Sequence, residues 1–491
     1  MRLIAKIKLN LINHKFGLAS FLLPLLIRAV PEVIVGPYPV GFDPIAFYVP
    51  ITLDWSSGSV GPLTMLGTAP LLYLFSVPVY ALTRVNPVWI FKVLGPVLYG
   101  SLVWALFRFL SLRLEWSQKN ALLGCLFTSI YFVTLRISWD LFRTELGLTF
   151  VLLMLPLLAR EKPKNQSFAI TVLLVLTVVS DELTGVLALL IMGSVIVWDL
   201  SHRESQQVRR RTLPFLIGSM VFSAITYSFF VYSSPNFPLP ASSHTVLGLP
   251  SIALFTPYVF LPLLPFMLLG VRRRVTLEFK VWILSCASLA IITAIPLPLF
   301  RETSYRWTLL MDIPVCIIAF TGIKIVFASA NRLSKVRLLR GLTRVGLPAI
   351  FISLALLYVV LPANMAMPYY VEFPDFIPTS MGQNTIPSYD IGNLVQSLGW
   401  VTNQSRPDIA LLTHQAIYGW ARLYFPHPSQ IVDYYYSTPS EGVQRAKALG
   451  FSSIYLVWWA NGTGWYGTPD VPDTFMVVHT VGDFSVYMYE T

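Results

Sequence analysis

The chain has 491 residues, of which 55% are hydrophobic and only 12% are charged, and its mean hydropathy is +0.65. This composition excludes a soluble globular protein and indicates a polytopic membrane protein. The formal net charge of +11 does not indicate a nucleic-acid partner, because the basic residues cluster in short loops between apolar runs, as the positive-inside rule expects.

The chain begins with a basic stretch that is followed by an apolar run over residues 16–35. A cleaved signal peptide and an uncleaved first helix both fit this pattern. We favour the uncleaved helix, because Arg28 and Glu32 stand four residues apart near its outer end and can form an ion pair there. The basic start then keeps the N-terminus in the cytoplasm.

The first outer loop, residues 36–61, leaves the membrane directly after this helix and carries the functional hypothesis. Its glycines and prolines rule out a regular helix through its first half. The loop places one carboxylate, Asp43, among aromatic side chains that include Tyr38 and Tyr48. We interpret Asp43 as the catalytic residue on the floor of an active site, with the two tyrosines lining a substrate cavity. The alternative is a turn-forming Asp before Pro44.

Apolar runs that approach the roughly 20 residues a transmembrane helix needs recur through residue 362, among them residues 213–232 and 345–361. Placing the five basic loops between them in the cytoplasm predicts eleven crossings. Residues 62–82, interrupted by glycine and proline, are then re-entrant or lie along the outer surface, whereas a span there would break the charge rule. We therefore expect an α-helical core of about 11–12 transmembrane helices in residues 1–362.

Residues 363–491 are polar and rich in Tyr and Trp, and they predict a small soluble domain outside the membrane. Helix and strand patterns alternate in this stretch, which favours an α/β domain. The last two strands are expected to form a hairpin around Gly482 and Asp483. The predicted helices cover 389–401 and 442–449, and the predicted strands cover 409–413, 453–458, 475–481 and 484–489.

Charged residues near helix ends gather on the predicted outer side of the membrane. They are Arg136, Asp140, Arg143 and Glu145 in RISWDLFRTELG, Asp181 and Glu182 in SDELTG, and Arg301, Glu302 and Arg306 in FRETSYRW. Ionisable groups at membrane depth are unfavourable unless they are paired or hydrated, so by default they mark function. With Asp43 they would form a polar cavity under the outer domain. The structural alternatives are helical ion pairs in the first segment, helix capping by Asp181, and interfacial anchoring by the two arginines of the last segment.

This layout resembles the GT-C superfamily of membrane glycosyltransferases, which use polyprenyl-phosphate-linked sugars and include protein mannosyltransferases and oligosaccharyltransferases. The loop GFDPIAFY is similar to the acidic motif in the first loop of that family. The segments SWDLFRTELG, SDELTG and FRETSYRW resemble parts of archaeal and bacterial members in which an outer-side arginine meets the lipid phosphate. The likeness covers the whole chain in layout but few residues in detail. Many members carry a second acidic residue beside the first-loop Asp, whereas here Pro44 follows Asp43.

The resemblance implies transfer of a sugar from a polyprenyl-phosphate donor in the membrane to a glycan, protein or lipid acceptor. Asp43 would act as the base, and Arg301 and Arg306 would stabilise the departing lipid phosphate, with Arg136 and Arg143 in reserve. The remaining carboxylates, Asp140, Glu145, Asp181, Glu182 and Glu302, would line the cavity. The six histidines show no metal spacing, and a divalent cation such as Mg²⁺ or Mn²⁺ is left open as a cofactor.

Two other functions fit the same membrane architecture. A flippase or transporter of a lipid-linked sugar usually contains internal repeats, and the sequence shows none by inspection. A non-catalytic sensor or assembly subunit would bind a glycan or a partner with its outer domain through Trp420, Trp458, Trp459 and Trp465.

Overall fold

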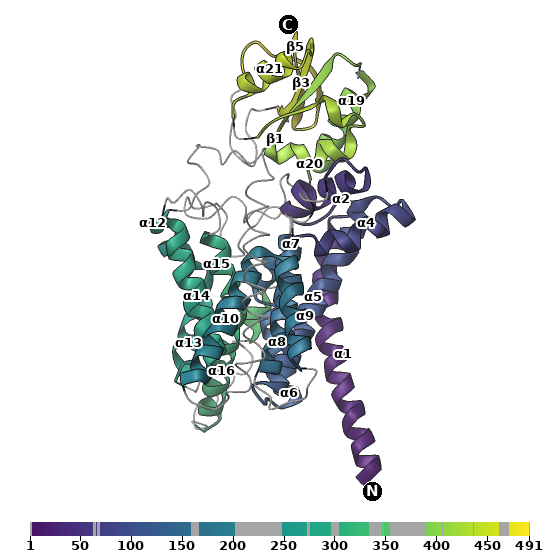
Figure 1. The fold of residues 1–491 in the computed structure, drawn as a ribbon. Helices are drawn as coiled ribbons and strands as arrows, with labels where there is room; N and C mark the ends of the chain where they lie inside the picture. Colours follow the sequence, from purple (N-terminus) through teal and green to yellow (C-terminus); the bar gives the residue numbers. More distant parts are fainter. Residues whose placement is uncertain are drawn as a thin grey trace.

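The computed structural model describes most of the chain. The described residues are 2–61, 65, 69–158, 166–201, 248–272, 275–295, 304–332, 346, 348–353, 386, 389–404, 406–435, 437–460 and 471–490. They form a bundle of helices with a small α/β domain at one end, and the N-terminus lies at the opposite end (Figure 1).

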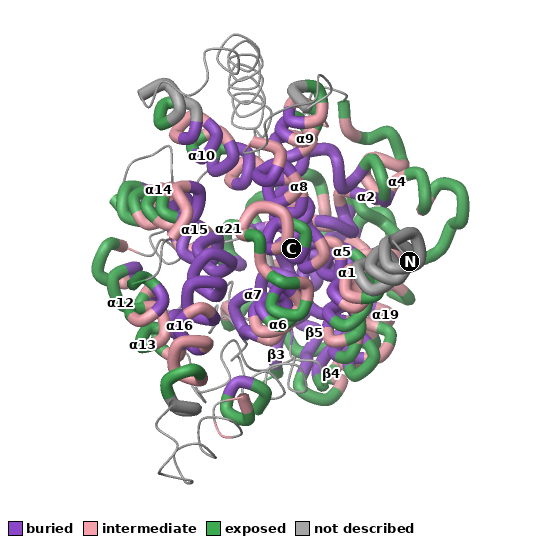
Figure 2. Tube along the Cα trace, turned by 90° about the horizontal axis from the view of Figure 1, so that it is seen from below, coloured by how far each residue is buried: buried purple, intermediate pink, exposed green. Residues whose placement is uncertain are grey.

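The bundle is built from helices of very different lengths. Its members are α1 (Arg2–Ile34), α5 (Pro87–Leu112), α6 (Gln118–Ser129), α7 (Phe132–Asp140), α8 (Phe142–Leu158), α9 (Gln166–Ser180), α10 (Glu182–Ser201), α12 (Leu249–Phe260), η2 (Leu261–Leu263), α13 (Leu264–Gly270), α14 (Leu277–Ala294), α15 (Ser304–Leu310) and α16 (Asp312–Arg332). Figure 2 shows buried segments of α5, α7 and α8 at the centre and exposed segments of α12 and α14 at the periphery. The exposed side chains of these outer helices are largely apolar, as a lipid-facing surface requires.

Five helical segments of the described chain are long and apolar enough to cross a membrane. They are Lys15–Ile34, Pro87–Leu112, Leu249–Gly270, Leu277–Ala294 and Ser304–Ser329. The pair α6 and α7, bent by 68°, qualifies as a sixth, broken span. The predicted class, a polytopic helical membrane protein, is therefore confirmed. The predicted run 213–232 and most of the run 345–361 lie outside the described residues, so the number of eleven or twelve crossings stays a prediction.

The stretch 62–82 does not contain a helix of spanning length among its described residues. Helix α4 (Leu71–Thr83) has 13 residues, contains Pro78, and ends at Arg84 in the left-handed conformation. At 1.5 Å per residue it extends about 20 Å, less than the roughly 30 Å of a bilayer core. It lies beside α2 (Val49–Ser56) at the end of the bundle that faces the C-terminal domain (Figure 1).

The C-terminal domain contains a five-stranded mixed sheet with the strand order β2-β1-β3-β5-β4. Strand β1 pairs in parallel with β2 and β3, and β5 pairs antiparallel with β3 and β4. Gly482, with a φ of 54°, forms the predicted hairpin turn. The predicted elements appear as α19 (Ile391–Gln404), β1 (Ile409–His414), α21 (Pro439–Ala448), β3 (Ser453–Trp459), β4 (Met476–Val481) and β5 (Phe484–Glu490).

Two elements of this domain were absent from the sequence prediction, α20 (Gln415–Tyr424) and β2 (Ile431–Tyr435). The imidazole Nδ1 of His414 accepts a hydrogen bond from the backbone N–H of Ala416 at 3.2 Å and so caps α20. Burial of this imidazole lowers the pKa of His414 to about 4, so the ring stays neutral and able to accept.

The tryptophans expected to stack on a glycan lie in the core of the domain. Trp420, Trp458 and Trp459 are 1%, 0% and 4% exposed. The interpretation that these three side chains bind a glycan or a partner is therefore wrong, because their rings are buried in the core of the domain. Trp465 lies outside the described residues.

Helix α20 packs directly on the first outer loop. A Cβ on Gly419 would collide with the carbonyl oxygen of Ile45, so the two backbones touch there. The ring of Tyr38 meets that of Trp420 edge-on at 5.8 Å between centroids, and Arg422 forms an ion pair with Asp54 of α2. The loop is thus covered by the C-terminal domain.

Candidate functional site

The first outer loop approaches α7 so closely that it requires glycine. Gly41 has a φ of 103°, and a Cβ there would overlap the carbonyl of Trp139 and the carboxylate of Asp140. The next residue, Phe42, donates its backbone N–H to Oδ1 of Asp140 at 2.5 Å. The loop is therefore docked on the last turn of α7 by a carboxylate that accepts from its backbone.

Asp43 follows immediately and is buried beneath the domain, with 8% of its surface exposed. The hydroxyl of Tyr48 lies 3.4 Å from Oδ2 of Asp43 and donates to the carbonyl of Asp140 at 2.8 Å. Pro44 begins η1 (Pro44–Tyr48), a short π-helix, and the Asp43 side chain forms no capping hydrogen bond to it. The side chain of Asp43 therefore does not have the turn-forming role that was the alternative to catalysis.

Three guanidinium groups act on the Asp43 carboxylate. Burial raises the pKa of Asp43 above its usual value, and the charges of Arg306, Arg136 and Arg143 oppose that rise. These arginines come from three different helices, α15, α7 and α8. The chain thus brings Asp43 and three of the four predicted arginines into one electrostatic cluster, which we call the Asp43 cluster.

Two of these arginines are engaged by carboxylates. Arg136 forms a buried ion pair with Asp140, four residues later in the same helix. Arg143 pairs with Glu182 at the start of α10, and it does not pair with Asp140. The i, i+4 ion pair was predicted, whereas the i, i+3 alternative for Asp140 and Arg143 is wrong because α7 ends at Asp140.

Arg306 differs from the other two arginines. It is partly exposed, and among the described residues it forms no ion pair. Its Nε donates to the hydroxyl of Tyr305 at 3.2 Å, and its guanidinium carbon lies 6.0 Å from the centre of that ring. Arg306 is therefore the cation of the Asp43 cluster that keeps the most capacity to bind an anion.

Asp181 and Glu182 have separate tasks at the N-terminus of α10. Oδ2 of Asp181 accepts from the backbone N–H of Thr184 at 2.9 Å, which confirms the capping interpretation. Glu182 holds Arg143. The charges of both carboxylates act on Arg143, which belongs to the Asp43 cluster. None of the described hydrogen bonds joins either carboxylate to the Asp43 loop.

The other predicted residues lie elsewhere. Glu145 is fully buried in α8, and neither of its carboxylate oxygens has a hydrogen-bond partner among the described residues. The charge of Arg28 acts on it, and that of Asp43 does not. The Tyr38 ring faces Trp420 of the domain. Arg301 and Glu302 lie outside the described residues.

Comparison with known proteins supports the fold. No family model matches the sequence, and no curated protein matches it. Among solved structures, the chain is similar to ArnT from Cupriavidus metallidurans bound to undecaprenyl phosphate, with a TM-score of 0.54, 12% identity and coverage of 98% of each chain. Against ArnT in the apo state the TM-score is 0.51, at 12% identity and coverage of 99% and 98%. The chain therefore has the fold of ArnT over essentially its whole length.

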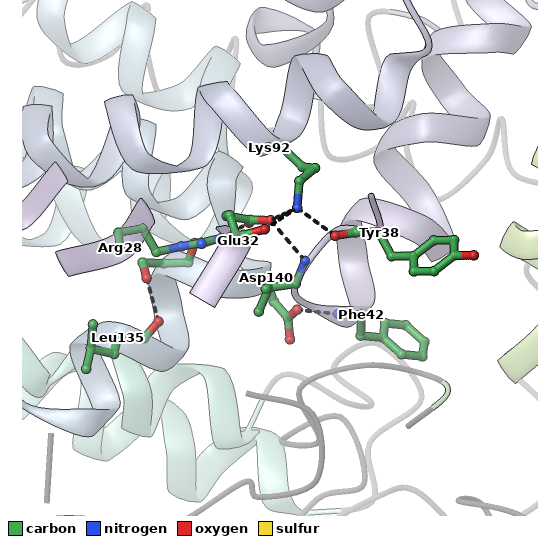
Figure 3. Close-up of polar contacts among 9 residues, drawn as sticks. Arg28, Glu32, Tyr38, Phe42, Lys92, Leu135 and Asp140 are labelled. Atoms are coloured by element: carbon green, nitrogen blue, oxygen red, sulfur yellow. Dashed lines mark hydrogen bonds and ion pairs between the residues drawn. The ribbon is translucent and has the colours of Figure 1, made fainter. Parts of the chain in front are cut away.

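Sequence reasoning missed several buried polar residues next to the Asp43 cluster. Lys92 of α5 is buried and contacts Glu32 and the first loop (Figure 3). The charges of Arg143 and Asp43 act on Tyr73 of α4. The carboxylate of Asp312, at the start of α16, accepts a hydrogen bond from the hydroxyl of Thr134 in α7. The one available signal for Lys92 was its solitary charge in the apolar run PVWIFKVLG.

No group of three His, Cys, Asp or Glu side chains in the described part of the chain gathers closely enough to hold a metal ion. Within the Asp43 cluster the carboxylates of Asp43 and Asp140 act on each other, and Asp140 is already occupied by Arg136 and the loop backbone. The donor set of the described residues at this cluster therefore does not fit a divalent cation.

Proposed function

We propose that this protein is an integral membrane glycosyltransferase that transfers a sugar from a polyprenyl-phosphate donor to an acceptor on the outer face of the membrane. The observation that carries the proposal is the Asp43 cluster, one buried carboxylate with three arginines from three helices acting on it. An acidic group beside several guanidinium groups suits a reaction in which a nucleophile loses a proton while a phosphate departs.

In the proposed reaction the acceptor attacks the anomeric carbon of the lipid-linked sugar. The new glycosidic bond forms as the bond from that carbon to the phosphate oxygen breaks. Asp43 takes the proton of the acceptor, and the polyprenyl phosphate leaves with the electron pair of the broken bond. Arg306 binds this phosphate, since arginine matches phosphate oxygens with two parallel N–H donors. The acceptor is a glycan, a protein or a lipid.

The other residues of the proposal support these two. Arg136 and Arg143 add positive potential at the phosphate while Asp140 and Glu182 hold them in place. We also propose Arg301 as a second phosphate ligand and Glu302 as a cavity residue, and for these two residues the support is the sequence resemblance alone. Tyr48 orients Asp43, because its hydroxyl lies between that carboxylate and the end of α7.

Two findings support the lipid-linked donor and the membrane location. The chain has the fold of ArnT, a protein whose crystal structure holds undecaprenyl phosphate. Its helices form a polytopic bundle with the Asp43 cluster at one end, under the C-terminal domain. We propose that this end faces the outer side and that the N-terminus is cytoplasmic, since the basic loops follow the positive-inside rule in that orientation.

The test is sugar transfer by the purified protein in lipid nanodiscs, followed with a radiolabelled polyprenyl-phosphate sugar and extracted membrane acceptors. Asp43→Asn keeps the size of the side chain and removes the base, and we expect it to lower transfer at least about 10³-fold. Asp408→Asn, at an exposed carboxylate of the C-terminal domain, is the matched control and should transfer normally.

Wild-type transfer by a folded Asp43→Asn variant would remove Asp43 from the mechanism. Movement of the intact lipid-linked sugar across the bilayer of proteoliposomes, without release of polyprenyl phosphate, would instead show a flippase. Binding of a glycan with no transfer by the wild-type protein would show a non-catalytic subunit.

A further inference from the structure

A second group of buried charges lies beside the Asp43 cluster without belonging to it. It consists of Arg28 and Glu32 of α1 and Lys92 of α5, whose side chains are 0%, 6% and 5% exposed (Figure 3). Nη2 of Arg28 lies 2.7 Å from Oε1 of Glu32, and Nζ of Lys92 lies 2.9 Å from Oε2. The charge of Arg28 also acts on Glu145, which is buried in α8.

The group holds the first loop through its backbone. Nζ of Lys92 donates to the carbonyl of Tyr38 at 2.7 Å and to the carbonyl of Glu32 at 2.7 Å. Together with the bond to the Glu32 carboxylate, these contacts use all three ammonium protons. Oε2 of Glu32 also accepts from the backbone N–H of Val40 at 3.3 Å. Lys92 and Glu32 therefore hold the loop backbone at Tyr38 and at Val40, just before Gly41.

The same group holds α7. Nε of Arg28 donates to the carbonyl of Ser138 at 3.0 Å. Ser138 lies between Arg136 and Asp140, which belong to the Asp43 cluster. One buried network thus bonds to the segment that carries Asp43 and to the helix that carries its first arginine, through backbone atoms in both.

Stability alone does not explain such a network. Removing three charges from water is costly, and the attraction between them often does no more than offset that loss. Apolar side chains would fill the same space between α1 and α5 at least as favourably. The loop, in contrast, has positive φ angles at Gly36 and Gly41, and these glycines offer no side-chain contact that could hold the backbone. The bonds from Lys92 and Glu32 supply such contacts from outside the loop.

We propose that Lys92, Glu32 and Arg28 are positioning residues that set the distance between the Asp43 loop and α7. The inference rests on the proposed glycosyltransferase function. Its described hydrogen bonds go to the first loop, to α1 and to α7, so in this proposal it acts by holding Asp43 opposite the arginines. Since displacement of a reacting group by about 1 Å lowers a rate by about 100-fold, loss of the network should appear in kcat.

The test compares Lys92→Met with the wild-type protein in the transfer assay. Methionine fills the space of the lysine stem and provides no donors, so we expect kcat to fall about 100-fold while KM for the lipid donor changes less than about threefold. Glu32→Gln should give a similar loss. The double variant should be little worse than either single variant, because the residues act as one unit.

Arg113→Met is the matched control. Arg113 pairs with the buried Glu278, with Nε 2.8 Å from Oε1, and follows the last residue of the same helix α5. It lies 21 residues after Lys92, which is about 30 Å along the helix. This variant breaks a partly buried ion pair far from the Asp43 loop, so it should lower Tm and leave kcat unchanged.

The outcomes separate the inference from the proposed function. Wild-type kcat in Lys92→Met, or an equal loss of kcat in Arg113→Met, would overturn the positioning role while sugar transfer stands. If the wild-type protein transfers no sugar, the proposed function fails. Structures of the wild-type protein and of Lys92→Met in nanodiscs then still test whether the network positions the loop. We expect the loop of Lys92→Met, residues 38–43, to be displaced from α7; an unchanged loop would overturn the inference.

Discussion

The bundle end that holds Asp43 and the C-terminal domain that covers it are built on opposite principles. Around Asp43 several buried side chains are charged and paired: Lys92–Glu32 joins α5 to α1, Arg143–Glu182 joins α8 to α10, and Arg136–Asp140 lies within α7. In the domain the core is apolar and aromatic, centred on side chains such as Trp420 and Trp458. Because buried charge is unfavourable unless it is paired and by default marks function in a membrane protein, we assign the proposed chemistry to the bundle end and a covering role to the domain.

Among the arginines of the Asp43 cluster, the largest effect on the rate should come from Arg306, which forms no ion pair with the described residues. Arg306→Met removes the charge that we propose meets the leaving phosphate, and we expect kcat to fall by about 10²–10³-fold with little change in Tm. Transfer assays and thermal melts of the same preparation measure both quantities. Arg306→Lys should recover part of the rate.

Arg136→Met is the contrasting variant. It leaves Asp140 as a buried carboxylate without its ion pair, so it should lower Tm markedly in addition to the rate. If Arg306→Met and Arg136→Met had the same effect on both quantities, the distinction between Arg136, which has an ion pair, and Arg306, which has none among the described residues, would be lost.

The next prediction concerns pH. Burial raises the pKa of Asp43 above its ordinary value of 3.8. A base works only when ionised, so kcat/KM should fall about tenfold per pH unit below the raised pKa of Asp43 in the free enzyme. The folded protein binds this proton more tightly than the unfolded chain, so the contribution of Asp43 to stability is present at low pH and is lost as pH rises through the raised pKa.

A pH series of kcat/KM and of Tm, run in parallel on Asp408→Asn, tests this sign. The pKa of the exposed Asp408 is lowered by its hydrogen bond with Ser452, so its removal should leave the acid limb in place. A rate that stays constant down to pH values below the ordinary pKa of Asp would exclude Asp43 as the base.

The smallest effect should come from the cover. Arg422→Met breaks the ion pair between α20 and Asp54, which is partly exposed and so contributes about 0–1 kcal/mol. Transfer should fall less than about fivefold, since the Gly419 contact and the Tyr38–Trp420 ring contact still seat the domain on the loop. A loss as large as that of Arg306→Met would mean that the domain takes part in the chemistry.

The sequence was sufficient for the features that depend on local spacing. The pairs Arg28–Glu32 and Arg136–Asp140 follow from an i, i+4 repeat, and the hairpin follows from Gly482. The cap by Asp181 follows from its place before an apolar run. These features require no knowledge of how distant segments pack.

Features set by helix rotation and by packing were beyond the sequence. Glu145 stands two residues after Arg143 in α8, so at about 100° per residue the two side chains point to nearly opposite faces. Arg143 therefore reaches Glu182, whereas Glu145 faces Arg28. Lys92 was missed because no local pattern around a single lysine in an apolar run indicates its distant partner, Glu32.

The short elements α20 and β2 were missed for a different reason. Helix α20 has ten residues and contains Gly419, which weakens its intrinsic helix preference. That glycine is retained because the backbone of Ile45 occupies the space of a Cβ. The contact with Ile45 thus explains why the residue is glycine, and the glycine in turn weakens the helix pattern in the sequence.

The most direct test of the central claim is a structure of the protein in nanodiscs with polyprenyl phosphate bound. The account predicts that the phosphate lies within hydrogen-bond distance of the Arg306 guanidinium, with the Asp43 carboxylate facing the same space. A phosphate bound at a distance from Arg306, with Asp43 still enclosed by Tyr48 and the loop, would contradict it.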